Sequence, residues 1–226
     1  MEFEKELSKA IEEAKDKSKS RKFVQAIDMV VNFTGVDFSK PDNRINIDVV
    51  LPKGRGKSVK VGIIASDELI TEAKKHEAVI IRKEEIESLG KNKKKLKKIV
   101  KQCDYFLCQA ELMPAVGKAL GQVLAPQGKM PKPVPGNAKL EPIIKRHEKL
   151  VALRSKGKFL PTLHTIIGTE EMSAADLGEN ATEIINMLKT KLPNKEGNIK
   201  SIFMKTSMGP TIKVGLPWQK KKEEKK

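Results

Sequence analysis

Alternating apolar and polar positions predict several β-strands toward the two ends of the chain. In residues 45–51, Ile45, Ile47 and Val49 alternate with mostly polar positions, a pattern typical of a half-buried strand. Residues 59–65 are almost wholly apolar, which indicates a strand covered on both faces, as in a parallel sheet. We expect further strands at 159–168, 198–206 and 211–217.

Apolar residues three or four positions apart predict helices near the same two ends. The N-terminal residues form one apolar helical face, and so do residues 176–192, where Asp176 and Glu179 are the expected capping pair. We also expect a short helix at 23–31. Between about residues 66 and 150, short strands alternate with helices, which predicts a layered βαβ unit.

The composition of the 226 residues indicates a folded protein with a sizeable core. Hydrophobic residues make up 38% and charged residues 33% of the chain. No apolar run approaches the length of about 18 residues that a transmembrane helix needs, and the charged N-terminus lacks the apolar stretch of a signal peptide. Cys103 and Cys108 are too few for a disulfide framework, so we expect both in the core of the middle region of a cytoplasmic protein.

The net charge of +16 narrows the choice of partner. Nucleic acid is the commonest polyanion that neutralises such a surplus of cations on a soluble domain. The 39 lysines against 6 arginines favour phosphate contacts over bidentate reading of bases. Aromatic residues make up only 4% of the chain, which argues against an extended base-stacking sheet. One interpretation is therefore a basic protein that binds nucleic acid without sequence specificity.

Residues 54–58, with the sequence GRGKS, are the strongest candidate for nucleotide chemistry. A phosphate-binding loop requires a glycine where Leu51 stands and a helix directly afterwards, whereas a strand is expected here. A P-loop-like nucleotide-dependent enzyme is therefore the weaker alternative, and a basic turn the favoured interpretation. The two cysteines and three scattered histidines match no metal-ligand spacing, so we expect no metal site, no cofactor and no catalytic residue.

Two lysine-rich segments are candidate contacts for a polyanion. Residues 91–101 contain seven lysines and no acid, which fits either a solvated helix face or a surface that binds a polyanion weakly. The glycine- and proline-rich segment 117–136 is long for a connector, and its glycines allow backbone amides to approach phosphate. His164, in an expected strand, is either a core or surface histidine or a phosphate contact.

The turn at 206–210, with the sequence TSMGP, allows two interpretations. Gly209 and Pro210 suit a tight turn between two strands. The hydroxyl groups of Thr206 and Ser207 could then contact ribose or phosphate while Met208 packs on a sugar or base. The alternative is a purely structural turn with Met208 in the core.

Four segments occur in a fixed order along the chain. They are KFVQAIDMVVNF (22–33), RINIDVVLPKGRGKSVKVGIIA (44–65), MPAVGKALGQVLAPQGKMPKPVP (113–135) and SIFMKTSMGPTIKV (201–214). Together they resemble the L-one family of large-subunit ribosomal proteins, the universal family of the lateral stalk, in its archaeal type. The resemblance covers nearly all of the chain except the lysine-rich tail.

The resemblance implies an α/β fold with two domains. A discontinuous α+β RNA-binding domain would be formed by residues 1–66 and 157–226, with a Rossmann-like three-layer βαβ domain inserted at 67–156. Two connecting strands in the family act as a hinge between the domains. We expect residues 219–226 to be a disordered tail, because they contain no apolar residue.

The resemblance also implies a function without catalysis. This chain is expected to be a structural protein of the lateral stalk, near the exit site for transfer RNA, and a translational repressor. The expected partners are a stem–junction of the large-subunit rRNA, the leader or coding region of its own mRNA, exit-site tRNA and other ribosomal components. We expect the protein on cytoplasmic ribosomes, monomeric when free and without a membrane partner.

Matching residues of the family motifs identify the expected RNA-binding side chains. They are Lys22, Phe23, Ser201, Thr206, Ser207, Met208 and Gly209. Ser207 stands where the family commonly has threonine, so the hydroxyl group is retained and a methyl group is lost. Auxiliary RNA contacts are expected from His164 and, in the middle region, from Lys118, Lys129 and Lys132.

Overall fold

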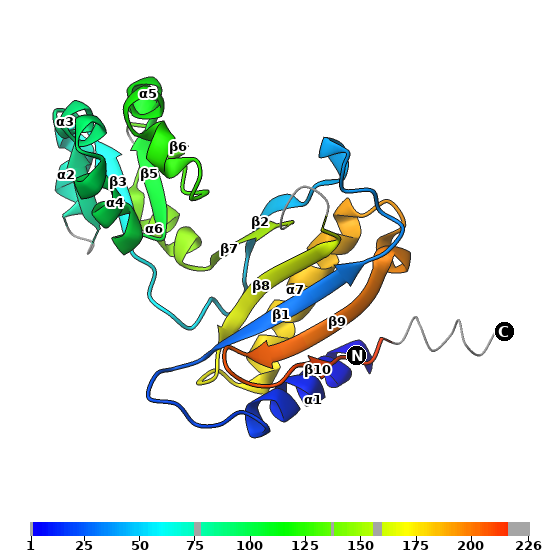
Figure 1. The fold of residues 1–226 in the computed structure, drawn as a ribbon. Helices are drawn as coiled ribbons and strands as arrows, with labels where there is room; N and C mark the ends of the chain where they lie inside the picture. Colours follow the sequence, from blue (N-terminus) through cyan, green and yellow to red (C-terminus); the bar gives the residue numbers. More distant parts are fainter. Residues whose placement is uncertain (1, 75–77, 137, 156–159, 217–226) are drawn as a thin grey trace. The chain divides into compact units, whose positions relative to one another are not determined.

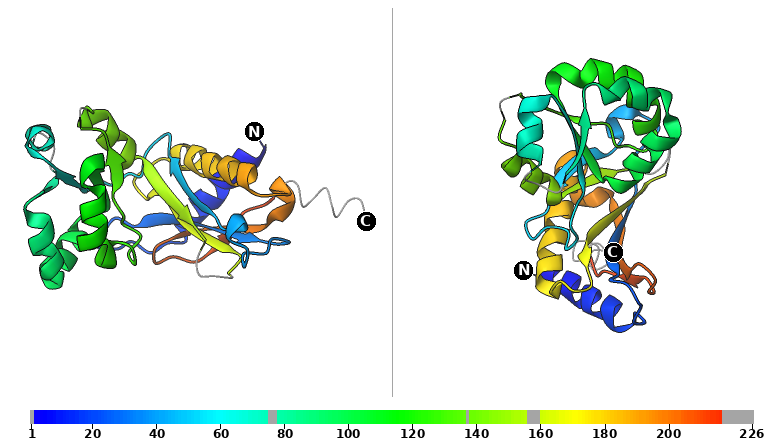
Figure 2. Two further views of the ribbon diagram at one scale, coloured as in Figure 1. Left: turned by 90° about the horizontal axis from the view of Figure 1, so that it is seen from above. Right: turned by 90° about the vertical axis from the view of Figure 1, so that its left-hand side faces the viewer.

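The chain forms two compact units (Figure 1, with two further views in Figure 2). This computed structural model describes residues 2–74, 78–136, 138–155 and 160–216. The outer unit consists of residues 1–57 and 149–226, and the inserted unit of residues 58–148. Both ends of the chain therefore contribute to the outer unit. The predicted disordered tail at 219–226 lies outside the described residues.

The borders of the inserted unit differ from the predicted borders at 66/67 and 156/157. Strand β3 (Val61–Ala65) belongs to the inserted unit because two parallel strands of that unit flank it. Strand β7 (Leu150–Arg154) belongs to the outer unit because it pairs antiparallel with β2 (Asn46–Val50). Both predicted borders lie too late in the chain, since local periodicity does not show which strands pair.

The outer unit is built on a four-stranded antiparallel sheet in the order β10-β9-β1-β8. Its strands are β1 (Ala26–Phe33), β8 (Thr162–Thr169), β9 (Ile199–Thr206) and β10 (Ile212–Lys213). Helices α1 (Glu2–Asp16) and α7 (Ala174–Lys191) pack against each other and share one core with the sheet (Figure 1). Side chains along β1 alternate between buried and partly exposed, so the face opposite the helices is left open.

The predicted helix at 23–31 is wrong, because residues 26–33 form the central strand β1. Every second side chain of this strand, from Ile27 to Phe33, is buried in the core. Pairing with β8 on one side and β9 on the other satisfies the strand backbone, and the β-branched isoleucine and valines favour an extended conformation. Tertiary pairing therefore outweighs the helical spacing of the apolar residues.

Helix α7 begins earlier than predicted, and Ser173 caps it. The Ser173 hydroxyl group accepts a hydrogen bond from the Asp176 amide at 3.1 Å and donates one to the Asp176 carboxylate at 2.7 Å. A side-chain oxygen at this position satisfies an amide that has no partner within the helix. The predicted capping pair of Asp176 and Glu179 is therefore wrong.

The inserted unit is a three-layer α/β structure around a parallel sheet in the order β4-β3-β5-β6. The further strands are β4 (Val79–Arg82), β5 (Tyr105–Gln109) and β6 (Lys132–Val134). One apolar cluster joins the sheet to α3 (Glu85–Lys91), α4 (Lys93–Gln102) and α5 (Met113–Leu124). A second cluster joins it to α2 (Asp67–Ala73) and α6 (Leu140–Glu148). The predicted α/β class is confirmed.

Both cysteines lie in the first of these clusters, as predicted. Burial raises the pKa of the Cys108 thiol to about 11, which keeps it protonated and unreactive at neutral pH. Single-turn helices occur at Pro41–Asn43, Ala110–Leu112 and Lys195–Asn198. Within the described ranges, no helix is both long and apolar enough to cross a membrane.

Candidate nucleic-acid interface

The open face of the outer sheet presents side chains from three adjacent strands. Strand register places His164 in one row with Val30 and Phe203, and it places Ser201 beside Asn32. His164 is exposed, which excludes the core position considered for it. Ser201 is buried, and its hydroxyl group accepts a hydrogen bond from the Asn32 amide at 3.0 Å. The Ser201 side chain is therefore already paired within the sheet.

Three loops meet at the end of the sheet where β1 begins and where β8 and β9 finish (Figure 1). We call residues 17–25, 170–173 and 206–210 together the sheet-end surface. The side chain of Gln25, only 1% exposed, joins all three loops. Its amide nitrogen donates to Ser18 Oγ at 3.1 Å and to Glu170 Oε2 at 3.2 Å, and its oxygen accepts from the Met208 amide at 3.2 Å.

The hydroxyl groups of the turn at 206–210 are used inside the protein. Thr206 is 0% exposed, and its hydroxyl group donates to Ser18 Oγ at 2.9 Å. Ser207 Oγ accepts from the Ala26 amide at 3.2 Å and lies 3.3 Å from the Ala26 carbonyl oxygen, to which it donates. Both side chains therefore hold the turn against β1 and its approach segment, and they do not project from the surface.

Glycine is required at position 209 because the turn brings this residue very close to the Thr206 side chain. A Cβ atom at this position would lie 2.2 Å from Thr206 Oγ1, far inside van der Waals contact. The Gly209 amide also donates to the Thr206 carbonyl oxygen at 3.2 Å, which closes the turn. The glycine thus keeps the turn tight enough to leave Met208 at its tip.

Apolar and basic side chains are exposed together on the sheet-end surface. Met208 is 62% exposed and Phe23 is 53% exposed, with Lys22 exposed beside Phe23. The alternative of a structural turn with Met208 in the core is therefore wrong. Val24, beside Phe23, is exposed as well, so this surface gathers three of the exposed large apolar side chains of the outer unit. A phenylalanine ring and a thioether side chain can both pack on unstacked bases or sugars, while lysine pairs with phosphate.

Hydrogen bonds with α7 hold the basic turn at 52–57 in place within the outer unit. The buried Asn180 side chain donates to the carbonyl oxygens of Gly54 and Ile167, both at 2.9 Å, and accepts from the Lys53 amide at 3.1 Å. Strand β3 is the next regular element after this turn, so the described residues lack the helix that a phosphate-binding loop needs. The interpretation of 52–57 as a basic turn therefore holds.

The Lys53 side chain is engaged in ion pairs. Its ammonium group lies 3.3 Å from Asp176 Oδ1 and 3.5 Å from Glu179 Oε2. The hydrogen bond to Asp176 and the charge of Glu179 raise the pKa of Lys53, while hydrogen bonds from Ser173 and Lys53 lower the pKa of Asp176. These pairs are exposed and contribute little to stability, but they turn the Lys53 charge toward α7.

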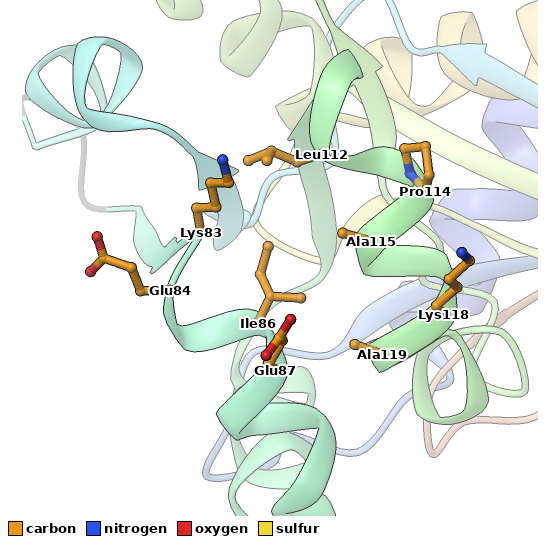
Figure 3. A pocket seen from close by; sticks show the side chains of 9 residues that line it. All are labelled: Lys83, Glu84, Ile86, Glu87, Leu112, Pro114, Ala115, Lys118 and Ala119. Carbon is orange, nitrogen blue, oxygen red and sulfur yellow. The ribbon is translucent and has the colours of Figure 1, made fainter.

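The three lysines expected as auxiliary contacts lie in different environments of the inserted unit. Lys118 is exposed on α5 and lines a cavity of about 800 Å³ between α3 and α5 (Figure 3). Lys129 is engaged, because its ammonium group donates to the carbonyl oxygens of Val100 at 2.8 Å and Cys103 at 2.6 Å. Lys132 is half-buried in β6. The glycine- and proline-rich segment 117–136 is not one loop, because it includes the end of α5, which continues to Leu124, and strand β6.

Sequence reasoning missed Gln25, Ser18 and Glu170, the residues that hold the sheet-end surface together. Gln25 finds its partners 145 and 183 positions away in the sequence. The only signal in the sequence is one polar residue directly before an alternating stretch, which is too weak to identify a buried glutamine. No group of three or more potential metal ligands occurs among the described residues.

Comparison with known proteins agrees with the predicted resemblance. The Ribosomal protein L1p/L10e family matches residues 9–210. The chain is 44% identical over 210 residues to large ribosomal subunit protein uL1 of Methanobrevibacter smithii, which covers 92% of this chain and 98% of that protein. It is 40% identical over 216 residues to uL1 of Methanocaldococcus jannaschii, which covers 96% of this chain and 98% of that protein. These matches span both units, and the chain belongs to the ribosomal protein L1p/L10e family, in its archaeal type.

Proposed function

We propose that this chain is a non-catalytic structural protein of the large ribosomal subunit, and that its outer unit binds a folded stem–junction of the large-subunit rRNA. One observation carries the proposal: Phe23 and Met208 are exposed on a sheet-end surface that internal hydrogen bonds hold in place. The relatives are large ribosomal subunit proteins uL1, which supports the ribosomal part of the proposal.

The chemistry of the sheet-end surface suits structured RNA better than regular duplex. Proteins recognise RNA mainly at loops and junctions, where unstacked bases are free to pack on aromatic and apolar side chains. Phe23 and Met208 can supply such contacts, and Lys22 can pair with a nearby phosphate. Because Gln25 and Ser207 already order the loops, little conformational entropy is lost when RNA binds.

The residues expected to bind RNA divide into two roles in this proposal. Phe23, Met208 and Lys22 touch RNA, whereas the hydroxyl groups of Thr206 and Ser207 position the turn that presents Met208. Ser201 is five positions before Thr206 along β9, roughly 16 Å away. Strand register places Ser201, like His164, on the open face of the sheet, and we propose this face as the second part of the interface.

We infer further that the protein acts in the lateral stalk near the exit site for tRNA. A similar RNA fold in its own mRNA would compete for the same sheet-end surface, which would make the protein a repressor of its own translation. In this proposal the protein is monomeric when free, works on cytoplasmic ribosomes and uses no cofactor.

Substitution of Met208 by aspartate tests the proposed surface. The carboxylate would face RNA phosphate or an apolar sugar, so binding to a large-subunit rRNA stem–junction fragment should weaken at least tenfold, about 1.4 kcal/mol. The Met130→Asp variant is the matched control, because Met130 is also exposed, at 43%, but lies in the inserted unit. Filter-binding titrations of both variants and the unaltered chain give the affinities.

Circular dichroism must show that both variants are folded. Unchanged affinity of a folded Met208→Asp protein would remove Met208 from the interface and contradict the proposed surface. Equal weakening by Met130→Asp would show that added negative charge alone explains the loss.

A further inference from the structure

The net charge of the inserted unit is concentrated in one short stretch. Residues 58–148 contain eighteen lysines and arginines and eleven aspartates and glutamates. Seven of these cations are the lysines of residues 91–101, which contain no acid, so the rest of the unit has eleven cations and eleven anions. The positive charge is therefore a local property of α4 and of Lys91 just before it.

These lysines destabilise the helix in which they lie. The first three residues of α4 are all lysines, at the end where the helix dipole favours acids and disfavours cations. Lysines also follow one another at spacings of three and four, as in Lys94, Lys98 and Lys101, and like charges at these spacings destabilise a helix. Sequences depart from local helix preference in this way mainly where function requires it.

Packing and capping hold α4 in place despite the repulsion. Leu96 and Val100 are buried in the core, and the Asn92 side chain caps the start of the helix by accepting from the Lys95 amide at 3.2 Å. Lys129 caps the other end through the Val100 and Cys103 carbonyl oxygens. The seven lysines are exposed on this scaffold, and none of them has an ion-pair partner among the described residues.

The chemistry of this face fits the backbone of a nucleic acid. The face lacks the exposed apolar side chains with which an amphipathic helix enters a lipid surface, because Leu96 and Val100 point into the core and Ile99 is half-buried. It also lacks arginine, whose planar group reads bases in a bidentate manner. Flexible ammonium groups on a rigid helix instead suit phosphates, which carry charge but no sequence information.

We propose that α4 and Lys91 form a second RNA-binding surface, which holds the phosphates of an RNA segment without regard to base sequence. The proposal rests on the RNA-binding function proposed above, but on different residues and in a different unit. The outer unit supplies specificity, and the lysine face adds affinity through the release of counterions. Its contribution should therefore depend steeply on salt and not on the RNA sequence.

The test compares the full chain with a Lys94→Gln/Lys98→Gln double variant. The probe is an RNA duplex of arbitrary sequence, titrated by fluorescence anisotropy between about 50 and 200 mM KCl, the range in which phosphate contacts dominate. Log affinity falls with log salt by about 0.9 per phosphate contact, so the loss of two contacts should make this negative slope shallower by about 1.8. Glutamine preserves helix propensity, and circular dichroism checks the fold.

The matched control is the Lys145→Gln/Lys189→Gln double variant, which removes the same charge. Lys145 and Lys189 are ion-paired with Glu141 and Glu196, so their removal should leave the salt slope unchanged. An unchanged slope in the α4 variant would overturn the proposal, and so would an equal loss in the control. Loss of binding to phosphatidylserine vesicles with unaltered RNA binding would assign α4 to a membrane surface and also overturn it.

These measurements distinguish a failure of the α4 proposal from a failure of the proposed sheet-end surface. The ratio of affinities for the rRNA junction fragment and the arbitrary duplex should stay constant in the α4 variant, because both RNAs offer phosphates. Met208→Asp should lower that ratio. A changed ratio in the α4 variant would show that α4 takes part in specific recognition and would overturn its sequence-independent role.

Discussion

At the end of the outer sheet, one glutamine side chain connects residues from three distant parts of the chain. Gln25 is almost fully buried, and Ser18, Glu170 and Met208 all depend on it for a hydrogen bond. A buried polar group that loses its partner costs about 1–3 kcal/mol. The positions of the exposed Phe23 and Met208 therefore depend on a residue that cannot itself touch RNA.

Replacing Gln25 with methionine tests this dependence. Methionine fills a similar volume but leaves the Met208 amide without its partner, so the free energy of unfolding should fall by about 1–3 kcal/mol. The Glu170 carboxylate loses the side-chain hydrogen bond at 3.2 Å and keeps the one from the main-chain amide of residue 25 at 3.0 Å. Affinity for the rRNA junction fragment should fall as well. Urea unfolding and RNA titration measure the two effects, and Gln122→Met, at an exposed position of α5, is the control that should change neither. If the Gln25→Met protein has the stability and RNA affinity of the unaltered chain, the loops keep their positions without the Gln25 side chain.

At the scale of elements, long periodic segments could be predicted from the sequence, and elements that depend on distant partners could not. The parallel strand β3 and the apolar faces of α1 and α7 follow from local patterns. Residues 26–33 carry both helical and alternating spacing, and only pairing with β8 and β9 decides between them. At the candidate site, the resemblance identified the exposed Met208 and Phe23, but no local signal showed that Thr206 and Ser207 bond inward.

Helix α5 offers a test of element stability. A Cβ atom at Gly117 or Gly121 would meet nothing within 4 Å, so alanine at either position should raise the free energy of unfolding by roughly 0.5–1 kcal/mol. Gly62→Ala in β3 is the contrasting variant, because its Cβ atom would lie 2.5 Å from the Phe106 ring and should destabilise the unit. Urea midpoints measure all three, and destabilisation by Gly117→Ala would mean that its surroundings are tighter than the structure shows.

At the scale of the whole molecule, the segments of the outer unit that lead to and from the inserted unit lie side by side. The Leu51 amide donates to the Lys149 carbonyl oxygen at 2.8 Å, and β2 and β7 pair just beyond these residues. Each unit also has apolar core clusters of its own. Both features indicate that the outer unit can fold without the inserted one.

Deleting residues 58–148 and joining Lys57 to Lys149 with a short glycine–serine linker tests this independence. The shortened chain should fold and should still prefer the rRNA junction fragment over random duplex, because the sheet-end surface lies wholly in the outer unit. Its affinity for both RNAs should fall, since the lysines of α4 are gone. A competition gel measures the preference, and a folded deletion variant that treats both RNAs alike would show that specificity depends on the inserted unit.

The central place of β1 in the outer sheet has a consequence for synthesis. Both neighbours of β1 come from the other end of the chain, so β1 emerges from the ribosome long before either can pair with it. The inserted unit has all its strands once residue 148 has emerged. It can therefore fold before β8 and β9 of the outer unit have been synthesised. Because the sheet-end surface needs Met208, a nascent chain must be almost complete before this surface can form.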